Sequence, residues 1–585
     1  LSMAVPMTLE VNGGGTLTNI ENIVFPGIVN LNDVNFNQNG VINIPSTTTF
    51  NYADTKPIAP NFDINNDGVF NINTALSAID ISANSALFIN NNELNILSQT
   101  NVFMLSDVQN NGTMNTVTNS SFIVNPLAVF TLNGGVSGTG ALSVNGTMNV
   151  TALTTLPSTL VLNLAAGGVI NNAENMTVAG LFNWSGGTVN GSGPGFTTEG
   201  TTTLQDAVLN AEWNLSTGSA SILSGGVTNF QTGSLTITGL TNFDINAGGT
   251  LNIVPGFSGI SGAGPLNVLA SSGLDLGGVA TDLSALNTMN VAGTVSNVQL
   301  ASLPQTVNVS STGELKGDGA LTILSATTLN MNGGTLSGIS STNPLNIVNQ
   351  GVIDVLSGQT LTPNFVNLDN IIGTISGAGT IDIPLNSSLG VTGSTASIAR
   401  IILNGGQLSA NSMSYSGNLD WNSGTVGGTG TGLTTTGQVD LQTGILNADW
   451  TITSTGVVNW NGPDSNSLTV NSVSITNQGQ FFVNGVATLV RGTLDDLAAK
   501  DLNGSSGAAF INEGLLLING DPLGLDTAAI IFSLDFQNIN GGDIGIQSGI
   551  FEITDSNGIA QDLNLGAGSE LQGLGTFEGS VINTA

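Results

Sequence analysis

Apolar and polar residues alternate in short runs along the whole chain, and a glycine precedes many of these runs. Residues 40–44 read GVINI, and the pattern returns as GTMNV at 146–150, GTLNI at 249–253 and GVIDV at 351–355. An alternation with period two turns successive side chains to opposite faces of a strand, one toward a core and one toward solvent. Gly, Asn and Asp separate the runs about every ten residues, so the pattern predicts short β-strands and an all-β fold.

The chain also repeats itself over long distances. Residues 182–213 align without gaps on residues 419–450 at an offset of 237 residues, and about half of the aligned positions are identical. Weaker similarity extends the duplication to about 136–254 and 375–491. Repetition at a fixed offset in a sequence rich in Gly and Asn is typical of solenoids.

The repeats therefore predict a single elongated parallel β-helix, or β-solenoid, over residues 1–585, and we expect it to be right-handed. If one turn of the solenoid takes roughly 22 to 26 residues, the chain makes about 22 to 27 turns. Stacked turns place like residues on like, so we expect Asn side chains at the corners to form hydrogen-bonded ladders.

One segment departs from the strand pattern. Residues 493–500 read TLDDLAAK and predict a short helix, with Thr493 and Asp496 at the spacing of a capping box. We interpret this segment as a helical insertion between two turns of the solenoid. A docking element is the alternative.

Charge is scarce and mostly negative. Only 7% of the residues are charged, against about 25% in an ordinary domain. The chain has 38 acidic and 5 basic residues, a net charge of −33, so it lacks the cationic surface that nucleic acid requires. Cys and His are absent, which excludes disulfides, Cys or Ser–His nucleophiles and the usual zinc sites. A hydrophobic content of 40% excludes a disordered protein.

The N-terminus of the sequence bears on its location. The sequence begins at Leu1 rather than Met, and it holds no run of the roughly 20 apolar residues that a membrane-spanning helix needs. We therefore expect removal of an export signal, an extracellular or cell-surface location and no membrane span. A trimmed cytosolic protein is the alternative.

Two runs carry a resemblance to known proteins, LDWNSGTVGGTGTG at 419–432 and SELQGLGTFEGSVINTA at 569–585. They resemble the repeats of secreted bacterial β-helical proteins, namely autotransporter passengers and filamentous-haemagglutinin-like adhesins. The resemblance covers nearly the whole chain, and it implies a right-handed parallel β-helix outside the cell that serves adhesion, biofilm matrix or filament formation. The chain departs from the haemagglutinin group because it lacks the NPNG-type secretion signature.

Residues 63–68, DINNDG, match the opening of a calcium-binding loop, in which alternate oxygen ligands face a cation. Asp63, Asn65 and Asp67 would be the ligands, although the twelfth position holds Thr74 instead of the usual bidentate Glu. A β-turn rich in Asn and Asp would give the same string. Calcium is the one cofactor that the sequence suggests, and no other feature requires a cofactor.

Four of the five tryptophans, Trp184, Trp213, Trp421 and Trp450, occupy equivalent positions in the two copies of the duplication. On the outside of a solenoid they could stack on sugar rings and bind carbohydrate. Large aromatic residues at repeat-equivalent positions are more often part of the core, so packing is the interpretation that we favour.

No enzymatic activity is expected. Enzymes of the β-helix type that cleave acidic polysaccharides combine clustered carboxylates with basic side chains, whereas the bases of this chain are scattered along it. They are Lys56, Lys316, Arg400, Arg491 and Lys500. No catalytic residue is therefore assigned, and a polysaccharide-degrading enzyme is a remote alternative.

Strand-like sequence begins by residues 7–11 and continues to the last residues, so neither end shows an obvious cap. Uncapped solenoid ends favour contacts between copies. We therefore expect an extracellular structural protein that joins end to end or side by side into a fibre, filament or sheath. The alternative is a surface adhesin with a β-helical stalk that binds carbohydrate or a host surface. Because the negative charges repel one another, we expect Ca²⁺ or higher ionic strength to strengthen assembly.

Overall fold

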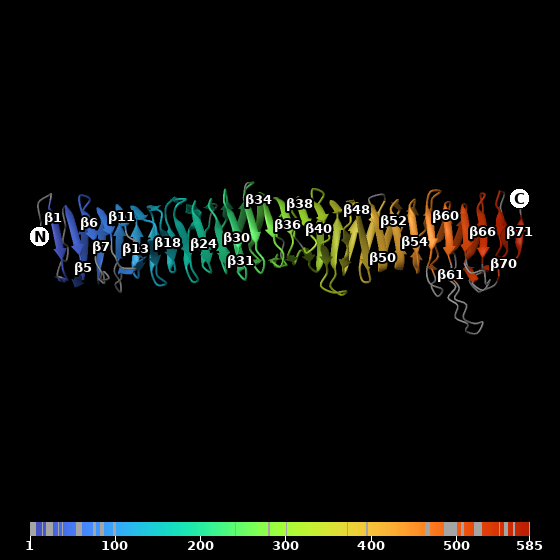
Figure 1. The fold of residues 1–585 in the computed structure, drawn as a ribbon, viewed down its shortest axis with the longest axis horizontal. Coiled ribbons are helices and arrows are strands. Elements are labelled where there is room, and N and C mark those ends of the chain that lie inside the picture. The colour runs from blue at the N-terminus through green and yellow to red at the C-terminus, as the bar shows by residue number, and fades with distance from the viewer. Residues whose placement is uncertain are drawn as a thin grey trace. The chain divides into compact units, whose positions relative to one another are not determined.

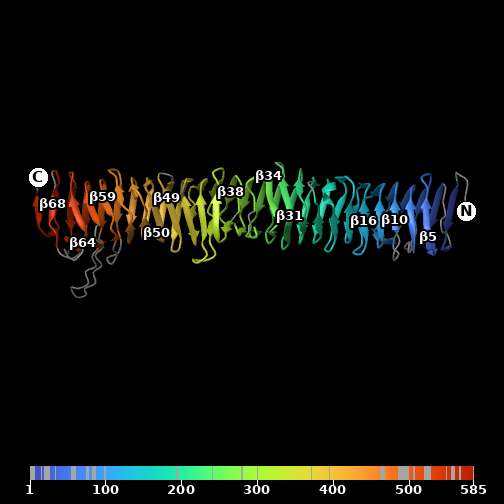
Figure 2. The ribbon, with the colours of Figure 1, turned by 180° about the vertical axis from the view of Figure 1, so that it is seen from behind.

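The computed structural model describes most of the chain in two compact units, Leu1–Ser296 and Asn297–Ala585. The described residues are 7–14, 16–18, 27–32, 34–37, 39–53, 61–73, 78–81, 87–97, 101–192, 195–239, 241–278, 281–299, 301–370, 372–393, 396–461, 468–484, 500–504, 508–519, 529–548, 550–554, 560–565 and 568–583. Figure 1 shows stacked strands in each unit, and Figure 2 shows the strands on the opposite side. The 3₁₀ helix η1 (Ala173–Asn175) is the only helical element in the described part of the chain, so the all-β prediction is confirmed.

Three strands make one turn of the solenoid. In the first unit, one turn consists of β14 (Thr113–Thr116), β15 (Ser121–Val124) and β16 (Val129–Leu132), and the next of β17 (Gly135–Gly138), β18 (Ala141–Val144) and β19 (Thr147–Val150). Each strand pairs in parallel with the corresponding strand of the next turn. The two units together hold about 22 turns, at the lower end of the expected range, which confirms the β-solenoid.

The core follows directly from the alternation of the sequence. The sheet of β16 and β19 continues through β22 (Val169–Asn171), β25 (Thr188–Asn190) and β28 (Val208–Asn210). One inward side chain from each of these five strands stacks in a fully buried column, which consists of Phe130, Met148, Ile170, Val189 and Leu209. Apolar residues therefore fill the inside while the residues between them face outward.

The second unit has the same three-sided turn, and some of its strands bend so that one strand forms two sides of a turn. One half of β52 (Asn418–Gly427) pairs with β54 (Gln438–Leu441), and the other half pairs with β55 (Gly444–Asn447). The third side of this turn is β51 (Met413–Tyr415), which pairs with β53 (Leu433–Thr435). The next strands along the three sides are β56 (Trp450–Ile452), β57 (Val457–Trp460) and β58 (Leu468–Val470).

Glycines precede strands because successive turns approach closely at the corners. A Cβ on Gly146 would lie 2.0 Å from the carbonyl oxygen of Asn125 in the preceding turn, and a Cβ on Gly218 would lie 1.8 Å from that of Gly200. No side chain fits at such distances. The recurring glycine of the sequence pattern is therefore a requirement of the stacking.

The predicted helix at 493–500 lies outside the described residues, except that Lys500 begins β61 (Lys500–Gly504). The handedness and the continuity of one solenoid over residues 1–585 stay predictions. Among the described residues, no helix has the length and apolar character needed to span a membrane.

Candidate functional site

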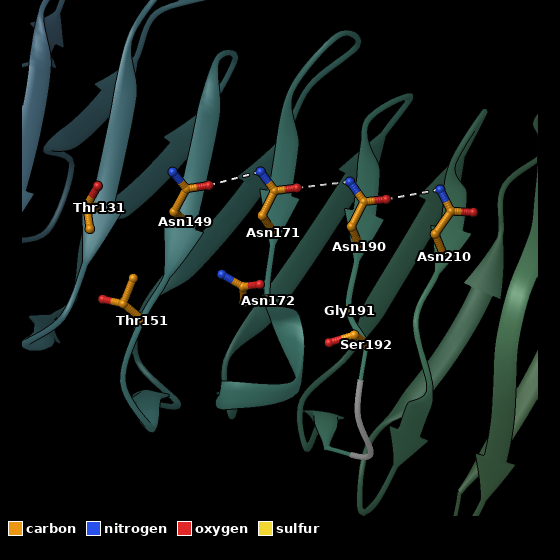
Figure 3. Close-up of a pocket in the computed structure, with 9 residues that line it drawn as sticks. All are labelled: Thr131, Asn149, Thr151, Asn171, Asn172, Asn190, Gly191, Ser192 and Asn210. Atoms are coloured by element: carbon orange, nitrogen blue, oxygen red, sulfur yellow. Dashed lines mark hydrogen bonds between the residues drawn. The ribbon is translucent and has the colours of Figure 1, made fainter.

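Asparagine side chains on an outer face of the first unit form a ladder that joins one turn to the next. Four amides stack along β19, β22, β25 and β28, and the Nδ2 of each of the last three donates a hydrogen bond to the Oδ1 of the Asn in the preceding turn (Figure 3). The N···O distances are 2.9 Å from Asn171 to Asn149, 3.0 Å from Asn190 to Asn171 and 3.0 Å from Asn210 to Asn190. This ladder runs along a strand face, whereas the sequence suggested ladders at corners.

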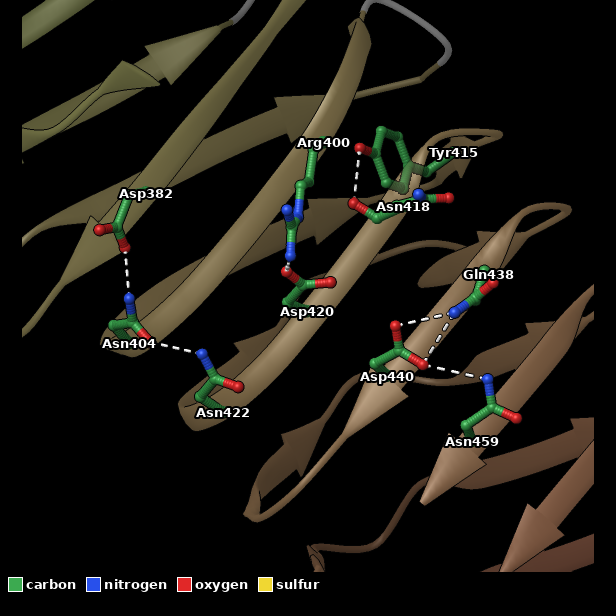
Figure 4. A network of polar contacts seen from close by, with 10 residues as sticks. All are labelled: Asp382, Arg400, Asn404, Tyr415, Asn418, Asp420, Asn422, Gln438, Asp440 and Asn459. Atoms are coloured by element: carbon green, nitrogen blue, oxygen red, sulfur yellow. Dashed lines mark hydrogen bonds and ion pairs between the residues drawn. The ribbon is translucent and has the colours of Figure 1, made fainter. Parts of the chain in front are cut away.

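The direction of these bonds explains where acidic residues stand. A carboxylate has no N–H, so it can accept a bond from the later turn but cannot donate one to the earlier turn. Asp382 begins such a ladder, because Asn404 donates to it over 2.7 Å and in turn accepts from Asn422 over 2.7 Å (Figure 4). Asp440 likewise accepts from Asn459 over 3.0 Å. In both ladders the acid occupies the one position that needs no donor.

An ion pair lies beside these ladders. Asp420 stacks one turn before Asp440. Arg400 forms the ion pair with Asp420, and its Nε lies 2.6 Å from the Asp420 Oδ2 (Figure 4). The hydroxyl of Tyr415 donates to the backbone oxygen of Asn418 over 3.1 Å. Burial raises the pKa of the Tyr415 hydroxyl, and the nearby Asp420 carboxylate adds to the shift. Arg400 thus compensates the negative charge of Asp420, one of the two stacked carboxylates. This contact stabilises the fold.

Buried ladders line the inner corners. Asn477, Asn512 and Asn538 are at most 2% exposed. Asn477 donates to Asn512 over 2.8 Å, and Asn512 donates to Asn538 over 2.7 Å. Their second N–H groups bind the backbone oxygens of Leu515 and Asp543, at 3.1 and 3.2 Å. The expectation of corner ladders is confirmed, and here the bonds run from the earlier turn to the later one.

The four repeat-equivalent tryptophans lie in the core. Trp184, Trp421 and Trp450 are 0% exposed and Trp213 is 1% exposed. The ring centroids of Trp184 and Trp213 are 6.1 Å apart at 60°, and those of Trp421 and Trp450 are 6.1 Å apart at 56°. The two copies therefore pack alike. Because no ring face reaches solvent, these rings cannot stack on a sugar, and packing is their role in this structure.

The candidate calcium ligands do not lie in a loop of the expected kind. Asp63 and Asn65 belong to strand β7 (Asn61–Asn66), and Asp67 follows it. Asp63 Oδ1 accepts a bond from the backbone N–H of Leu87 at 2.9 Å, and Asn91 Nδ2 donates to Asn65 Oδ1 at 3.0 Å and to Asp67 Oδ1 at 2.8 Å. Oxygens that would face a cation thus accept hydrogen bonds from the following turn. These contacts agree with a structural role for the string, which was the alternative to calcium binding. Within the described residues, no group of three or more acidic side chains is arranged to hold a metal ion.

A groove runs along the Asn149–Asn210 ladder, and no sequence pattern had indicated it. Its lining residues are drawn in Figure 3, and its volume is about 640 Å³. One side consists of the ladder and Thr131, and the other of residues that follow the same strands. The full lining is Thr131, Asn149, Thr151, Asn171, Asn172, Asn190, Gly191, Ser192 and Asn210. None of these side chains ionises, so the groove offers neutral amides and hydroxyls to a ligand and no acid or base.

Comparison with known proteins adds no relative to this description, because no protein-family profile matches the chain and no curated protein is significantly similar to it.

Proposed function

We propose that the chain is an extracellular structural protein that assembles with copies of itself, end to end or side by side, into a fibre, filament or sheath. The observation that carries the proposal is the outer Asn ladder, in which polar side chains on the surface hydrogen-bond to the neighbouring turn. A solenoid derives its stability from contacts between neighbouring turns. The buried Asn ladders and the outer Asn ladders therefore stiffen each unit, as a scaffold requires.

Scarcity of charge supports contacts between copies. In many proteins, charged side chains, especially Lys, on exposed β-strands prevent those strands from associating with another chain. Only 7% of the residues of this chain are charged, and only 5 are basic. The net charge of −33 opposes association, and this repulsion weakens when salt shortens the Debye length to about 8 Å at 0.15 M. Assembly should therefore depend on ions.

The proposed location is outside a bacterial cell, as the resemblance to secreted β-helical proteins implies. The protein is proposed to have no enzymatic activity and to require no cofactor. Self-association is the interaction that the proposed function requires, and no nucleic-acid partner and no membrane span are proposed.

Sedimentation velocity of the full chain tests the proposal. At low salt with EDTA we expect a slowly sedimenting species, and with about 0.15 M NaCl or with CaCl₂ we expect larger species that disperse when EDTA and low salt are restored. A sedimentation coefficient that stays the same in all of these buffers would count against assembly.

A second candidate is a surface adhesin. The neutral groove beside the Asn149–Asn210 ladder favours it, because a surface that recognises a carbohydrate needs aligned hydrogen-bonding groups. An adhesin would remain monomeric under the conditions above and would bind to a glycan or a cell surface.

A further inference from the structure

The groove has two polar sides that repeat from turn to turn. On one side Asn149, Asn171 and Asn190 stack in the ladder. On the other side Thr151 and Asn172, which are exposed, follow the same strands. Figure 3 shows the ladder residues in one row and Thr151, Asn172 and Ser192 beyond the strand ends. Successive turns are about 4.8 Å apart, so the four ladder residues span about 14 Å along the unit.

The ladder leaves hydrogen-bonding capacity unused. An amide side chain has two N–H donors and two acceptor lone pairs on its oxygen. Asn171 and Asn190 each use one N–H toward the earlier turn and accept one bond from the later turn. Each therefore retains one donor and one lone pair, and both side chains are partly exposed along the groove.

The ladder also fixes the orientation of these groups. Each amide is held by its neighbours, so a ligand would not lose free energy by ordering freely rotating side chains. A repeating, pre-ordered row of donors and acceptors suits a ligand that itself repeats along its length.

Charge and shape narrow the class of ligand. The lining has no ionisable side chain, and the chain carries a net charge of −33, so an anionic polymer would be repelled. A peptide strand would need pockets for its side chains to gain specificity, whereas this lining consists of Asn, Thr, Ser and Gly. A linear neutral polysaccharide presents hydroxyl donors and acceptors along both edges, matching the two sides of the groove.

We propose that this groove binds a linear neutral polysaccharide, with the sugar chain lying along the ladder. The inference does not rest on the proposed self-assembly. The second copy of the duplication lacks the same ladder, because Gly427 stands where the first copy has Asn190. The second copy is therefore not expected to bind.

Isothermal titration calorimetry of the full chain tests the proposal, with cellohexaose, xylohexaose and laminarihexaose as neutral probes and a galacturonic acid hexamer as the anionic probe. We expect saturable binding of at least one neutral hexamer, with a Kd on the order of 0.1–1 mM, and none of the anionic hexamer. Absence of saturable binding for all three neutral hexamers would overturn the proposal, as would tighter binding of the anionic hexamer.

Two variants locate the binding. Asn190→Gly introduces the residue of the second copy, and Thr151→Lys places a long side chain in the groove while keeping the ladder intact. Each should weaken binding at least about tenfold. The matched control is Asn330→Gly, which removes a ladder bond of 2.8 Å to Asn308 in the other unit. It should bind like the unaltered chain.

The outcomes separate a glycan site from other roles. Unaltered affinity in both groove variants would overturn the proposal, and so would an equal loss in Asn330→Gly, since that would reflect general destabilisation. If Thr151→Lys changed the sedimentation of the chain while no hexamer bound, the groove would be a contact between copies and the glycan site would be ruled out.

Discussion

Trp213 donates its indole N–H to the hydroxyl oxygen of Thr198 over 2.9 Å, and both side chains are buried. Trp450 makes the same bond to Thr435 over 3.0 Å, 237 residues further along the chain. The duplication therefore preserves a hydrogen bond as well as a packing arrangement. Each threonine is the polar partner that allows an indole to lie inside an apolar core.

Replacing that acceptor should destabilise the first unit. Thr198→Val keeps the shape of the side chain but leaves the Trp213 N–H buried without a partner, at a cost of about 1–3 kcal/mol. Scanning calorimetry should show a lower melting temperature. Thr177→Val, at an outward position one turn earlier in the same sheet, is the control and should have little effect. An unchanged melting temperature for Thr198→Val would show that the bond contributes nothing.

Because the hydrogen bonds of the outer ladder all run in one direction, an acidic substitution should change the stability differently at the two ends of the ladder. Asn149→Asp keeps the oxygen that accepts from Asn171, whereas Asn210→Asp loses the donor that binds Asn190 and sets a carboxylate against its oxygen. Both variants add one negative charge. Asn210→Asp should therefore be the less stable by about 0.5–1.5 kcal/mol at neutral pH, as measured by chemical denaturation. Equal stabilities would contradict the rule that acids can only begin a ladder.

Inner ladders should matter more than outer ones. Asn512→Ala removes the acceptor of Asn477 and the donor to Asn538, both of which are buried, and should cost at least about 2 kcal/mol. Hydrogen exchange should become faster in β59 (Ser474–Asn477), β62 (Ala509–Asn512) and β65 (Asp535–Asn538).

The control for the inner ladder is Asn471→Ala. This exposed side chain donates to Asn447 over 2.8 Å, and its loss should cost about 1 kcal/mol or less. Equal changes in hydrogen exchange for the inner and outer variants would show that burial of the ladder makes no difference.

Tyr415 should make the second unit sensitive to high pH. Its pKa is raised in the folded state by burial and by Asp420, so the folded chain holds the phenol proton more tightly than the unfolded chain does. The resulting stabilisation is complete below the ordinary tyrosine pKa of about 10 and is lost as pH rises above it. Denaturant midpoints measured from pH 8 to 11 should fall more steeply for the unaltered chain than for Tyr415→Phe. Parallel curves would exclude this contribution.

The fold could be predicted because its signal is local. Alternation with period two marks each strand, and glycine marks corners such as Gly146, where a Cβ has no room. The same alternation also placed the tryptophans, since Trp184 is in phase with the buried Phe182, and Trp213 with the buried Leu215. The phase of the alternation therefore favours packing over carbohydrate binding for these tryptophans.

The groove could not be predicted because it depends on how turns of unequal length stack. The ladder residues Asn149, Asn171, Asn190 and Asn210 are separated by 22, 19 and 20 residues, so no constant period reveals that they are neighbours. The local structure of the calcium-like string could not be predicted for a related reason. Its spacing matches a loop, but the alternation within Asn61–Asn66 makes that segment a strand.

Electron microscopy of the purified full chain at high concentration tests the central claim most directly, since assembly can be seen without a ligand. With CaCl₂ or about 0.15 M NaCl we predict uniform fibres or sheets, which disperse at low salt with EDTA. Separate particles of a single size in every buffer would contradict the claim that this solenoid is a self-assembling structural protein.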